Sequence, residues 1–528
     1  MKTISKAVLV FLVCVLAGPL VSQTSKTNTV AIHADQGRDT ISRNIYGQFS
    51  EHLGHCIYGG IWVGEQSTIP NTRGIRNDVV AALKNIKIPN LRWPGGCFAD
   101  EYHWMDGIGP RSQRPKMVNT NWGGVTEDNS FGTHEFMDLC TQLGCEPVIC
   151  GNLGSGTVKE MADWVQYLTS DGENPMSALR KKNGRAEPWK VKFWGVGNES
   201  WGCGGIMSPD GYASELAKYS FFLKNYGSNS LYKISSGGLE NDTVWTETVM
   251  KKRASADGWL KSFMSGYSLH YYTVCNTWDK KGSATDFDEK EWFQTMSKTI
   301  HIEDLIRKHS VVMDKYDPKK EIGLIVDEWG NWHDVEPGTN PGFLFQQNTM
   351  RDAIVAALNL NIFHKHCDRV KMTNIAQIVN VLQSVILTDG PKMVLTPTYH
   401  VYDLYKVHQD AVMIPVDVVS EEYTVDGGTG IPAISASASV DAKGVMHISL
   451  VNVNPSKPVT VRCNISGAAA KKITGRILTS VKMQDHNTFE KPNAVGIHDF
   501  SQFKTAGGEL QVEMPSKSIV VLEVQTKP

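Results

Sequence analysis

Short β-branched runs alternate with longer amphipathic stretches between residues 45 and 395. Between the runs, Val79, Val80, Leu83 and Ile86 recur at helical spacing, and Ser208-Pro209 places a capping serine before a proline at the first helical position. Alternating strands and helices indicate a parallel sheet, and eight repeats over roughly 350 residues predict a (β/α)8 barrel. The eight runs are Asn44–Phe49, Ile88–Trp93, Glu146–Ile149, Val191–Gly195, Lys233–Ser236, Gly266–Tyr271, Glu321–Asp327 and Val370–Ile375.

After about residue 395 the pattern changes to short alternating strands separated by Gly, Pro, Asn and Lys turns. Val445–Val451, Val459–Cys463 and Ser518–Val524 are examples. This pattern is typical of an all-β sandwich, here expected to be jelly-roll-like. Val30–Ala34 is also predicted to be a strand. We therefore expect a barrel over 45–395, a sandwich over 396–528, and a strand within 23–44 that joins the sandwich.

The first 22 residues have the pattern of a secretory signal peptide. Two lysines precede the apolar run Ala7–Leu16, and a small residue stands at Ser22. A lipoprotein anchor at Cys14 is the alternative, but the bulky Val13 before it disfavours this. The run is too short to span a membrane, and no later segment reaches that length. The sequence thus predicts a secreted or periplasmic protein without a membrane span.

The composition of the chain limits the classes of partner that we expect. The 53 basic and 55 acidic residues give a formal charge of −2 without long runs of one sign, so no nucleic-acid partner is expected. Hydrophobic residues make up 41% of the 528, which excludes a disordered chain. The 14 tryptophans suit a cleft that stacks on flat apolar faces such as sugar rings.

Nine cysteines follow the predicted leader at irregular spacing. No C-x-x-C pair occurs among them, which argues against a zinc ribbon. Because the number is odd, at least one must be a free thiol. We expect most of them to be small buried side chains.

Polar residues follow the predicted barrel strands, where the active groups of such barrels lie. Glu199 ends the fourth run and Glu328 the seventh, and each is followed within two residues by a tryptophan. Two carboxylates that face each other across a barrel mouth fit glycoside hydrolysis, in which one attacks the anomeric carbon and the other protonates the leaving oxygen. Asn198 would donate its amide to a sugar hydroxyl. An acid at the end of a strand can instead cap a helix or pair with an arginine. The presence of two such acids, on the fourth and seventh strands, disfavours this purely structural interpretation.

Two other motifs point elsewhere. His52 and His55 resemble metal ligands, but no third ligand pattern accompanies them, so we expect no metal. Gly151–Gly156 resembles a phosphate loop only loosely, because no Gly-Lys-Ser/Thr follows it, and we interpret it as a turn. No cofactor is expected.

Seven segments, which follow one another along the chain, carry a family resemblance: FSEHLG (49–54), IYGGIW (57–62), LRWPGG (91–96), WGVGNES (194–200), SLHYY (268–272), DEWG (327–330) and MTNIAQ (372–377). From about residue 30 to the C-terminus the chain resembles α-L-arabinofuranosidases of glycoside hydrolase family 51, retaining barrels with catalytic glutamates on strands four and seven. The resemblance implies an exo-acting enzyme that releases terminal L-arabinofuranose from arabinan- or arabinoxylan-type polysaccharides or oligosaccharides. It also implies a homo-oligomer, often a hexamer in the family.

The resemblance further implies roles for individual residues. Glu199 matches the general acid/base, and Glu328 matches the nucleophile. Cys97 is expected to line the subsite for the arabinofuranosyl ring instead of forming a disulfide, and Trp104 matches an aromatic wall of that pocket. The loop 201–205 departs from the family pattern, which leaves the preferred polymer open. Matches to the residues that hold the ring are Glu51, Asn198, Tyr272 and Gln377.

Two alternatives stay open at this point. One is another retaining barrel glycosidase, such as an endo-xylanase or a β-xylosidase. The other is a carbohydrate-binding protein whose barrel has lost catalysis, which the presence of both glutamates disfavours.

Overall fold

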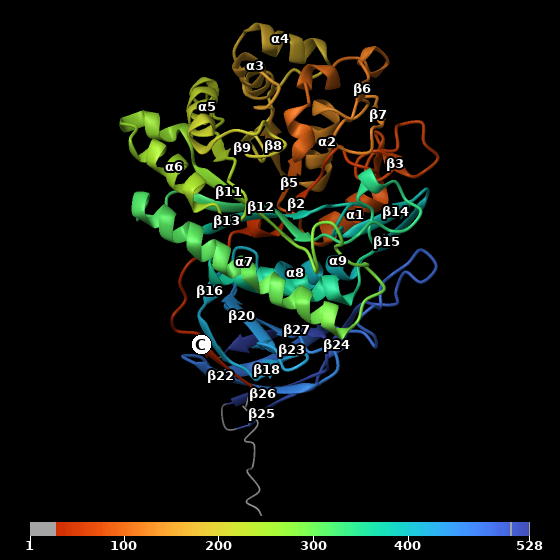
Figure 1. The fold of residues 1–528 in the computed structure, drawn as a ribbon, viewed down its shortest axis with the longest axis vertical. Helices are drawn as coiled ribbons and strands as arrows, with labels where there is room; N and C mark the ends of the chain where they lie inside the picture. The colour runs from red at the N-terminus through yellow and green to blue at the C-terminus, as the bar shows by residue number, and fades with distance from the viewer. Residues whose placement is uncertain (1–27, 507–508, 527–528) are drawn as a thin grey trace, which may run out of the picture.

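Eight parallel strands close into a barrel in the computed structural model, which describes residues 28–506 and 509–526 (Figure 1). Each strand overlaps one of the eight predicted runs, so the predicted barrel is confirmed. Around the barrel the strands are β2 (Gly47–Phe49), β5 (Asn90–Trp93), β8 (Glu146–Gly151), β9 (Phe193–Val196), β10 (Tyr232–Ser235), β11 (Gly266–Thr273), β12 (Gly323–Asn331) and β13 (Val370–Ala376).

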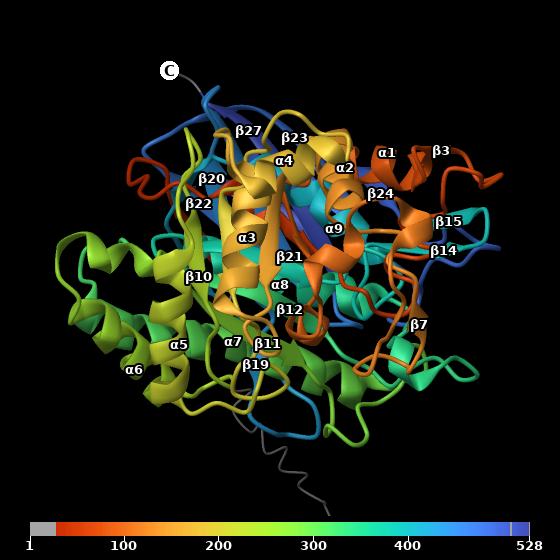
Figure 2. The ribbon, with the colours of Figure 1, turned by 90° about the horizontal axis from the view of Figure 1, so that it is seen from above.

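Helices cover the outside of the barrel. Ser208 caps α5 by accepting the amide proton of Gly211 at 3.2 Å, and Pro209 opens that helix, as predicted. Seen from above, α3, α5 and α6 lie side by side around one part of the barrel (Figure 2). The helices are α1 (Asn77–Asn85), α2 (Thr133–Leu143), α3 (Val158–Thr169), α4 (Pro175–Lys182), α5 (Pro209–Phe222), α6 (Thr243–Ala254), α7 (Glu289–Tyr316), α8 (Met350–Lys365) and α9 (Pro397–Tyr405).

The inside of the barrel changes from apolar to polar along the strands. Five buried side chains from five different strands form a compact apolar cluster at the lower level: Val148, Phe193, Ile234, Ile325 and Met372. Further along the strands the inner positions become polar, as in β11, where Ser268, His270 and Tyr272 alternate with apolar neighbours. The barrel therefore has a packed floor and a polar mouth at the carboxyl ends of its strands.

The C-terminal part is a sandwich of two sheets, as predicted. One sheet has the order β16-β20-β21-β27-β23-β24 and the other β17-β1-β22-β26-β25, and buried residues of both sheets, such as Val30 and Leu522, share one core. The strand β1 (Asn28–His33) pairs with β22 and β17, so it lies in the second sheet. The remaining bounds are β16 (Val412–Ile414), β17 (Val416–Val419), β20 (Ile434–Val440), β21 (Val445–Asn452), β22 (Val459–Ser466), β23 (Ala470–Leu478), β24 (Ile497–Phe500), β25 (Phe503–Ala506), β26 (Glu509–Met514) and β27 (Ser518–Thr526).

The helix α8 lies between barrel and sandwich and is buried from Met350 to His364 (Figure 1). His364 shows how the two parts are joined: its ring nitrogens lie 2.7 Å from the Tyr46 hydroxyl on the barrel side and 2.9 Å from the Ser437 hydroxyl on the sandwich side. Within the described residues, no helix has the length and apolarity needed to cross a membrane.

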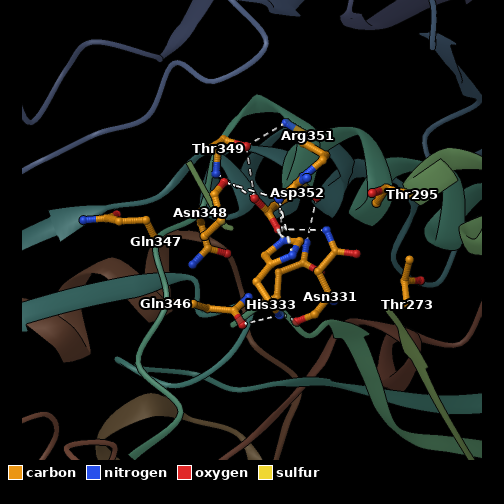
Figure 3. Close-up of polar contacts among 12 residues, drawn as sticks. Thr273, Thr295, Asn331, His333, Gln346, Gln347, Asn348, Thr349, Arg351 and Asp352 are labelled. Atoms are coloured by element: carbon orange, nitrogen blue, oxygen red, sulfur yellow. Dashed lines mark hydrogen bonds and ion pairs between the residues drawn. The ribbon is translucent and has the colours of Figure 1, made fainter. Parts of the chain in front are cut away.

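A buried polar network ties the start of α8 to the segment that leaves β12 (Figure 3). The Asp352 carboxylate accepts hydrogen bonds from the Asn331 amide at 2.8 Å and from the Thr349 backbone N–H at 2.7 Å. Its Oδ1 also lies 3.1 Å from Nε2 of His333. Burial and the charge of Arg351 lower the pKa of His333, so the neutral ring donates a hydrogen bond from Nε2 to Asp352.

We expect the substitution Asp352→Ala to lower the free energy of unfolding by about 3–5 kcal/mol, because it leaves the buried donors of Asn331, His333 and Thr349 without their acceptor and removes a negative charge that stabilises the buried Arg351. Urea unfolding measures this loss. Asp304→Ala is the matched control, since Asp304 pairs with the exposed side chains of His301 and Arg307, and a change within about 0.5 kcal/mol is expected there. Equal losses in the two variants would contradict the role of the network.

Candidate active site

Two glutamates meet at the mouth of the barrel. Glu199 follows β9, and Glu328 lies near the end of β12. One carboxylate oxygen of each and one ring nitrogen of His270 all lie within 4.8 Å of one another. Nδ1 of His270 is 2.9 Å from Glu199 and 3.6 Å from Glu328. The two side chains that the sequence singled out are thus brought together, with a histidine between them.

A tight turn presents Glu199 to the mouth. Gly197 has φ +84° and Glu199 has φ +37°, both in the left-handed region, which is costly for a glutamate. The backbone N–H of Asn198 donates to the buried Asp100 carboxylate at 3.1 Å, which fixes the turn between them. This contact stabilises the unfavourable backbone conformation of Glu199, and such conformations are common at functional sites.

The Glu328 carboxylate is held by two strong donors. Arg92 donates to one oxygen at 2.8 Å, and the Tyr272 hydroxyl donates to the other at 2.7 Å. Burial and the negative charge of Glu328 raise the pKa of Tyr272 well above its usual value, so the tyrosine remains a proton donor. A Cβ atom at Gly96 would lie 2.7 Å from Glu328, so only glycine permits this close approach of the backbone.

Arg92 connects the strands that carry the two glutamates, and the motif analysis did not predict this role. It donates to the Asn198 side-chain oxygen at 2.7 Å, and its Nε lies 3.5 Å from Asp327. Burial alone would lower the pKa of Arg92, but Asp327 and Glu328 raise it, so the guanidinium stays charged. A charged residue inside an apolar strand run, between Leu91 and Trp93, was the available signal.

His270 supplies a second positive charge. Burial by itself would lower the pKa of His270, but the charges of Glu328 and Asp327 and the hydrogen bond to Glu199 raise it to about 10. Asp327 is buried as well, and Arg92 and His270 nevertheless lower its pKa. The cations of the mouth therefore lie directly against its carboxylates.

Glu51 anchors a second polar group on the neighbouring strands. One oxygen accepts hydrogen bonds from the backbone N–H groups of Gly96 at 2.9 Å and Phe98 at 3.2 Å and from the Trp122 indole at 3.0 Å. The other oxygen accepts from the Gln377 amide at 3.0 Å. Burial and the charge of Glu328 raise the pKa of Glu51 to about 7. Of these residues, Trp122 lies in a loop without a recognisable pattern and was not predicted.

The expectation that Cys97 forms no disulfide is wrong. Cys97 is bonded to Cys203, with their Cα atoms 5.5 Å apart, and Cys203 Sγ lies 3.6 Å from the Glu199 carboxylate. The bond joins the loop after β5 to the loop after β9, 106 residues later, and the sequence pattern does not show that these loops meet. The other seven cysteines within the described residues are free, and all except Cys145 are buried, as expected.

Trp104 does not wall the pocket, so this prediction is also wrong. Its side chain is buried, with 1% of its surface exposed, and lies parallel to Trp164. Its indole donates to the Glu160 carbonyl at 3.0 Å, so it packs under α3 and away from the mouth. The tryptophan that contacts Glu51 is Trp122.

Within residues 28–506 and 509–526, two groups of side chains have the spacing of metal ligands. In the group Cys97, Glu199 and Cys203 the sulfurs are bonded to each other and offer no thiolate. In the group Glu199, His270 and Glu328, Arg92 already donates to Glu328, and a charged His270 repels a cation. The charges of this second group favour proton transfer over metal binding. His52, one of the two candidate ligands from the sequence, is buried and accepts a hydrogen bond from the Trp93 indole at 3.1 Å.

Comparison with known proteins decides the family. Residues 82–290 match the model of an α-L-arabinofuranosidase 1 domain, and residues 327–518 match that of an α-L-arabinofuranosidase C-terminal domain. A relative from Bacteroides ovatus, named an intracellular exo-α-L-arabinofuranosidase, is 54% identical over 98% of this chain and 100% of its own. A GH51 arabinofuranosidase from Xanthomonas axonopodis pv. citri is 48% identical, with a TM-score of 0.92 over 94% of this chain and 100% of that chain. The chain belongs to the α-L-arabinofuranosidases of glycoside hydrolase family 51.

The family membership confirms the resemblance and makes the chain a glycoside hydrolase. An α-L-arabinofuranosidase from Thermotoga maritima, solved as an arabinose complex, is 31% identical, with a TM-score of 0.80 over 95% of this chain and 100% of that chain. Membership of this hydrolase family argues against the two alternatives left open by the sequence, a xylan-cleaving barrel enzyme and a barrel without catalysis.

The prediction of a secreted or periplasmic protein is overturned. The Bacteroides ovatus relative is named an intracellular enzyme, which points away from secretion. The predicted leader, residues 1–22, lies outside the described residues. An apolar run of about ten residues behind two lysines matches a leader by composition alone, and composition does not determine how a cell handles the segment.

Proposed function

We propose that the chain is a retaining, exo-acting α-L-arabinofuranosidase that releases terminal L-arabinofuranose from arabinan- or arabinoxylan-type polysaccharides or oligosaccharides. The observation that carries the mechanism is the distance of at most 4.8 Å between carboxylate oxygens of Glu199 and Glu328. Retaining glycosidases hold their two carboxyl groups about 5–5.5 Å apart, whereas inverting enzymes need about 6.5–9.5 Å to admit a water. The name of the Bacteroides ovatus relative supports the exo-action.

In the first step the Glu328 carboxylate attacks the anomeric carbon while Glu199 gives its proton to the departing oxygen. The glycosidic bond breaks, the leaving group departs as an alcohol, and an arabinosyl ester forms on Glu328 with inversion at the anomeric carbon. Arg92 and Tyr272 contact the two oxygens of Glu328 and orient it for this attack.

In the second step the Glu199 carboxylate takes a proton from water, and the oxygen of that water attacks the anomeric carbon. The ester bond breaks, Glu328 is regenerated, and the second inversion restores the α configuration. His270, 2.9 Å from Glu199, offsets the negative charge that Glu199 carries between the steps.

The arabinofuranosyl ring is proposed to bind between the glutamates and the Glu51 group. Glu51, Asn198, Tyr272 and Gln377 offer acceptors and donors to its hydroxyls, and the Gln377 side-chain oxygen has no partner among the described residues. Cys97 contributes through its bond to Cys203. We also propose that 45–395 forms the catalytic domain, and that 396–528 together with the strand in 23–44 packs on it as a structural domain.

The stereochemistry of the product tests the mechanism. We expect the first-released sugar to be the α-anomer of L-arabinofuranose, because two inversions restore the starting configuration. Proton NMR of an aryl α-L-arabinofuranoside digest, recorded within the first minutes before mutarotation, measures this. If the β-anomer appears first, water attacks directly and the assignment of Glu328 as nucleophile fails.

A further inference from the structure

The two glutamates divide the barrel mouth into two unequal arcs. Between β12 and β9 on one side lie β13, β2, β5 and β8, and this arc carries Glu51 and Gln377. On the other side lie only β10 and β11. If the ring of the cleaved sugar binds against the Glu51 group, the remainder of the substrate extends over the arc of β10 and β11.

A chain of aromatic contacts leads outward over this second arc. Tyr272, which donates to Glu328, packs edge-on against Trp332 at 5.0 Å between ring centroids, and Trp332 packs edge-on against Trp278 at 5.4 Å. Trp278 is 52% exposed and is the only exposed tryptophan among those whose side chains the structure describes. About half of the indole surface is therefore open to a ligand, and the other side of the ring packs on Trp332.

A cavity of about 460 Å³ opens beside Trp278 and Tyr272. Its wall also includes the side chains of Glu240, Asn276 and Thr277. No described residue donates a hydrogen bond to the Glu240 carboxylate, which leaves it available to ligand hydroxyls. An aromatic face combined with a carboxylate, an amide and a hydroxyl matches the alternating apolar faces and hydroxyl edges of a sugar.

The loop that carries Trp278 is fixed to the loop that follows Glu328. The backbone N–H groups of Lys281 and Gly282 donate to the two oxygens of Asp334 at 3.2 and 3.1 Å, and the Asp334 N–H donates back to Gly282 at 3.0 Å. The Lys281 ammonium donates to the Trp278 carbonyl at 2.7 Å. Trp278 is therefore held in place before any ligand binds, which lowers the entropic cost of binding.

We propose that Trp278 and this cavity form a binding site for the pyranosyl unit that carries the arabinofuranose, so that the enzyme prefers arabinose-substituted xylan-type chains over arabinan. This proposal rests on the function proposed above and specifies its substrate class. A pyranose chair with equatorial hydroxyls presents a flat face of axial C–H groups to an indole, whereas a puckered furanose offers a smaller and less regular one. The cavity, with a volume of about 460 Å³, is large enough for a sugar ring.

The test compares three substrates in wild-type enzyme and in Trp278→Ala: 4-nitrophenyl α-L-arabinofuranoside, xylotriose carrying one arabinofuranose, and α-1,5-arabinotriose. We expect kcat/KM of Trp278→Ala to fall about tenfold on the substituted xylotriose and less than threefold on the other two. The nitrophenyl substrate reports that the variant is folded. Trp278→Phe should recover most of the loss, and Phe222→Ala, which removes an exposed aromatic from α5, should change no substrate.

Inhibition provides a readout without cleavage of the ligand. Unbranched xylotriose should inhibit nitrophenyl arabinoside hydrolysis, and its inhibition constant should rise about tenfold in Trp278→Ala. Equal losses on all three substrates, an equal loss on arabinotriose, or an unchanged inhibition constant would each overturn the inference while leaving the arabinofuranosidase function intact. If the wild-type enzyme releases arabinose from none of the substrates, the proposed function itself fails.

Discussion

The substitution Glu328→Ala is expected to lower kcat/KM by about 10⁴-fold or more on every arabinofuranoside, including those with activated aryl leaving groups. A better leaving group cannot compensate, because no other carboxylate can form the ester. Asp327 is the nearest alternative, but it faces Arg92, His270 and Ser268 on the inner side of the barrel. Initial rates on a nitrophenyl arabinofuranoside and on an arabino-oligosaccharide measure the loss.

Rescue of Glu328→Ala by azide would identify the missing carboxylate as the nucleophile. Azide can occupy the space left by the Glu328 side chain and attack the anomeric carbon directly, while Glu199 still protonates the leaving oxygen. That single displacement inverts the centre and yields the β-arabinosyl azide. Glu328→Gln keeps the size of the side chain and should be equally inactive but not rescued, and Glu247→Ala, at the exposed surface of α6, should be fully active. Near-normal activity of Glu328→Ala would refute the assignment of the nucleophile.

The local sequence pattern was sufficient to predict the barrel and the meeting of Glu199 and Glu328. Strands buried on both faces must be continuous apolar runs, so the pattern around Ile325 or Met372 locates them within a few residues. Parallel strands of a barrel end on the same side, so polar residues that follow different strands must meet. That rule, applied to Glu199 and Glu328, predicts a common site without any knowledge of the loops.

The errors concern contacts that loops make. Cys97 and Cys203 meet only because the glycine-rich turn after Asn198 folds back toward the end of β5, and no local periodicity encodes such a fold. Trp104, which begins a short 3-10 helix, and Trp122, which lies in a turn, are close in sequence, yet one is buried under α3 and the other contacts Glu51. A choice between them requires the path of the chain through that loop.

Arg92 is a different case, because its signal was present in the sequence. A guanidinium within a fully buried strand must find carboxylates or carbonyls, since an unpaired buried charge costs several kcal/mol. Its polar partners are the Glu328 carboxylate at 2.8 Å, the Asn198 side-chain oxygen at 2.7 Å, and the carboxylate and carbonyl of Asp327, both at 3.5 Å. A buried arginine three residues before the turn Gly95-Gly96 therefore predicts an acidic cluster at the mouth of the barrel.

For Glu199→Ala we expect an effect that depends on the leaving group. Natural linkages should lose about 10³-fold or more in kcat/KM, because an alkoxide cannot depart without a proton. An aryl group of low pKa leaves unaided, so the first step survives and the ester on Glu328 accumulates. Stopped-flow absorbance should then show a burst of nitrophenol followed by slow turnover, since no base activates water in the second step.

The response to azide distinguishes Glu199→Ala from Glu328→Ala. In Glu199→Ala the anion attacks the accumulated ester, so turnover of the aryl substrate should rise several-fold, and the product should be the α-arabinosyl azide after two inversions. The opposite anomers expected from the two variants follow from the different positions of Glu199 and Glu328 around one anomeric carbon. His270 remains in the variant, 3.6 Å from Glu328, so a surviving acid function would reveal itself as undiminished activity on natural linkages. Equal loss on aryl and natural substrates, without any response to azide, would show that Glu199 is not the acid/base.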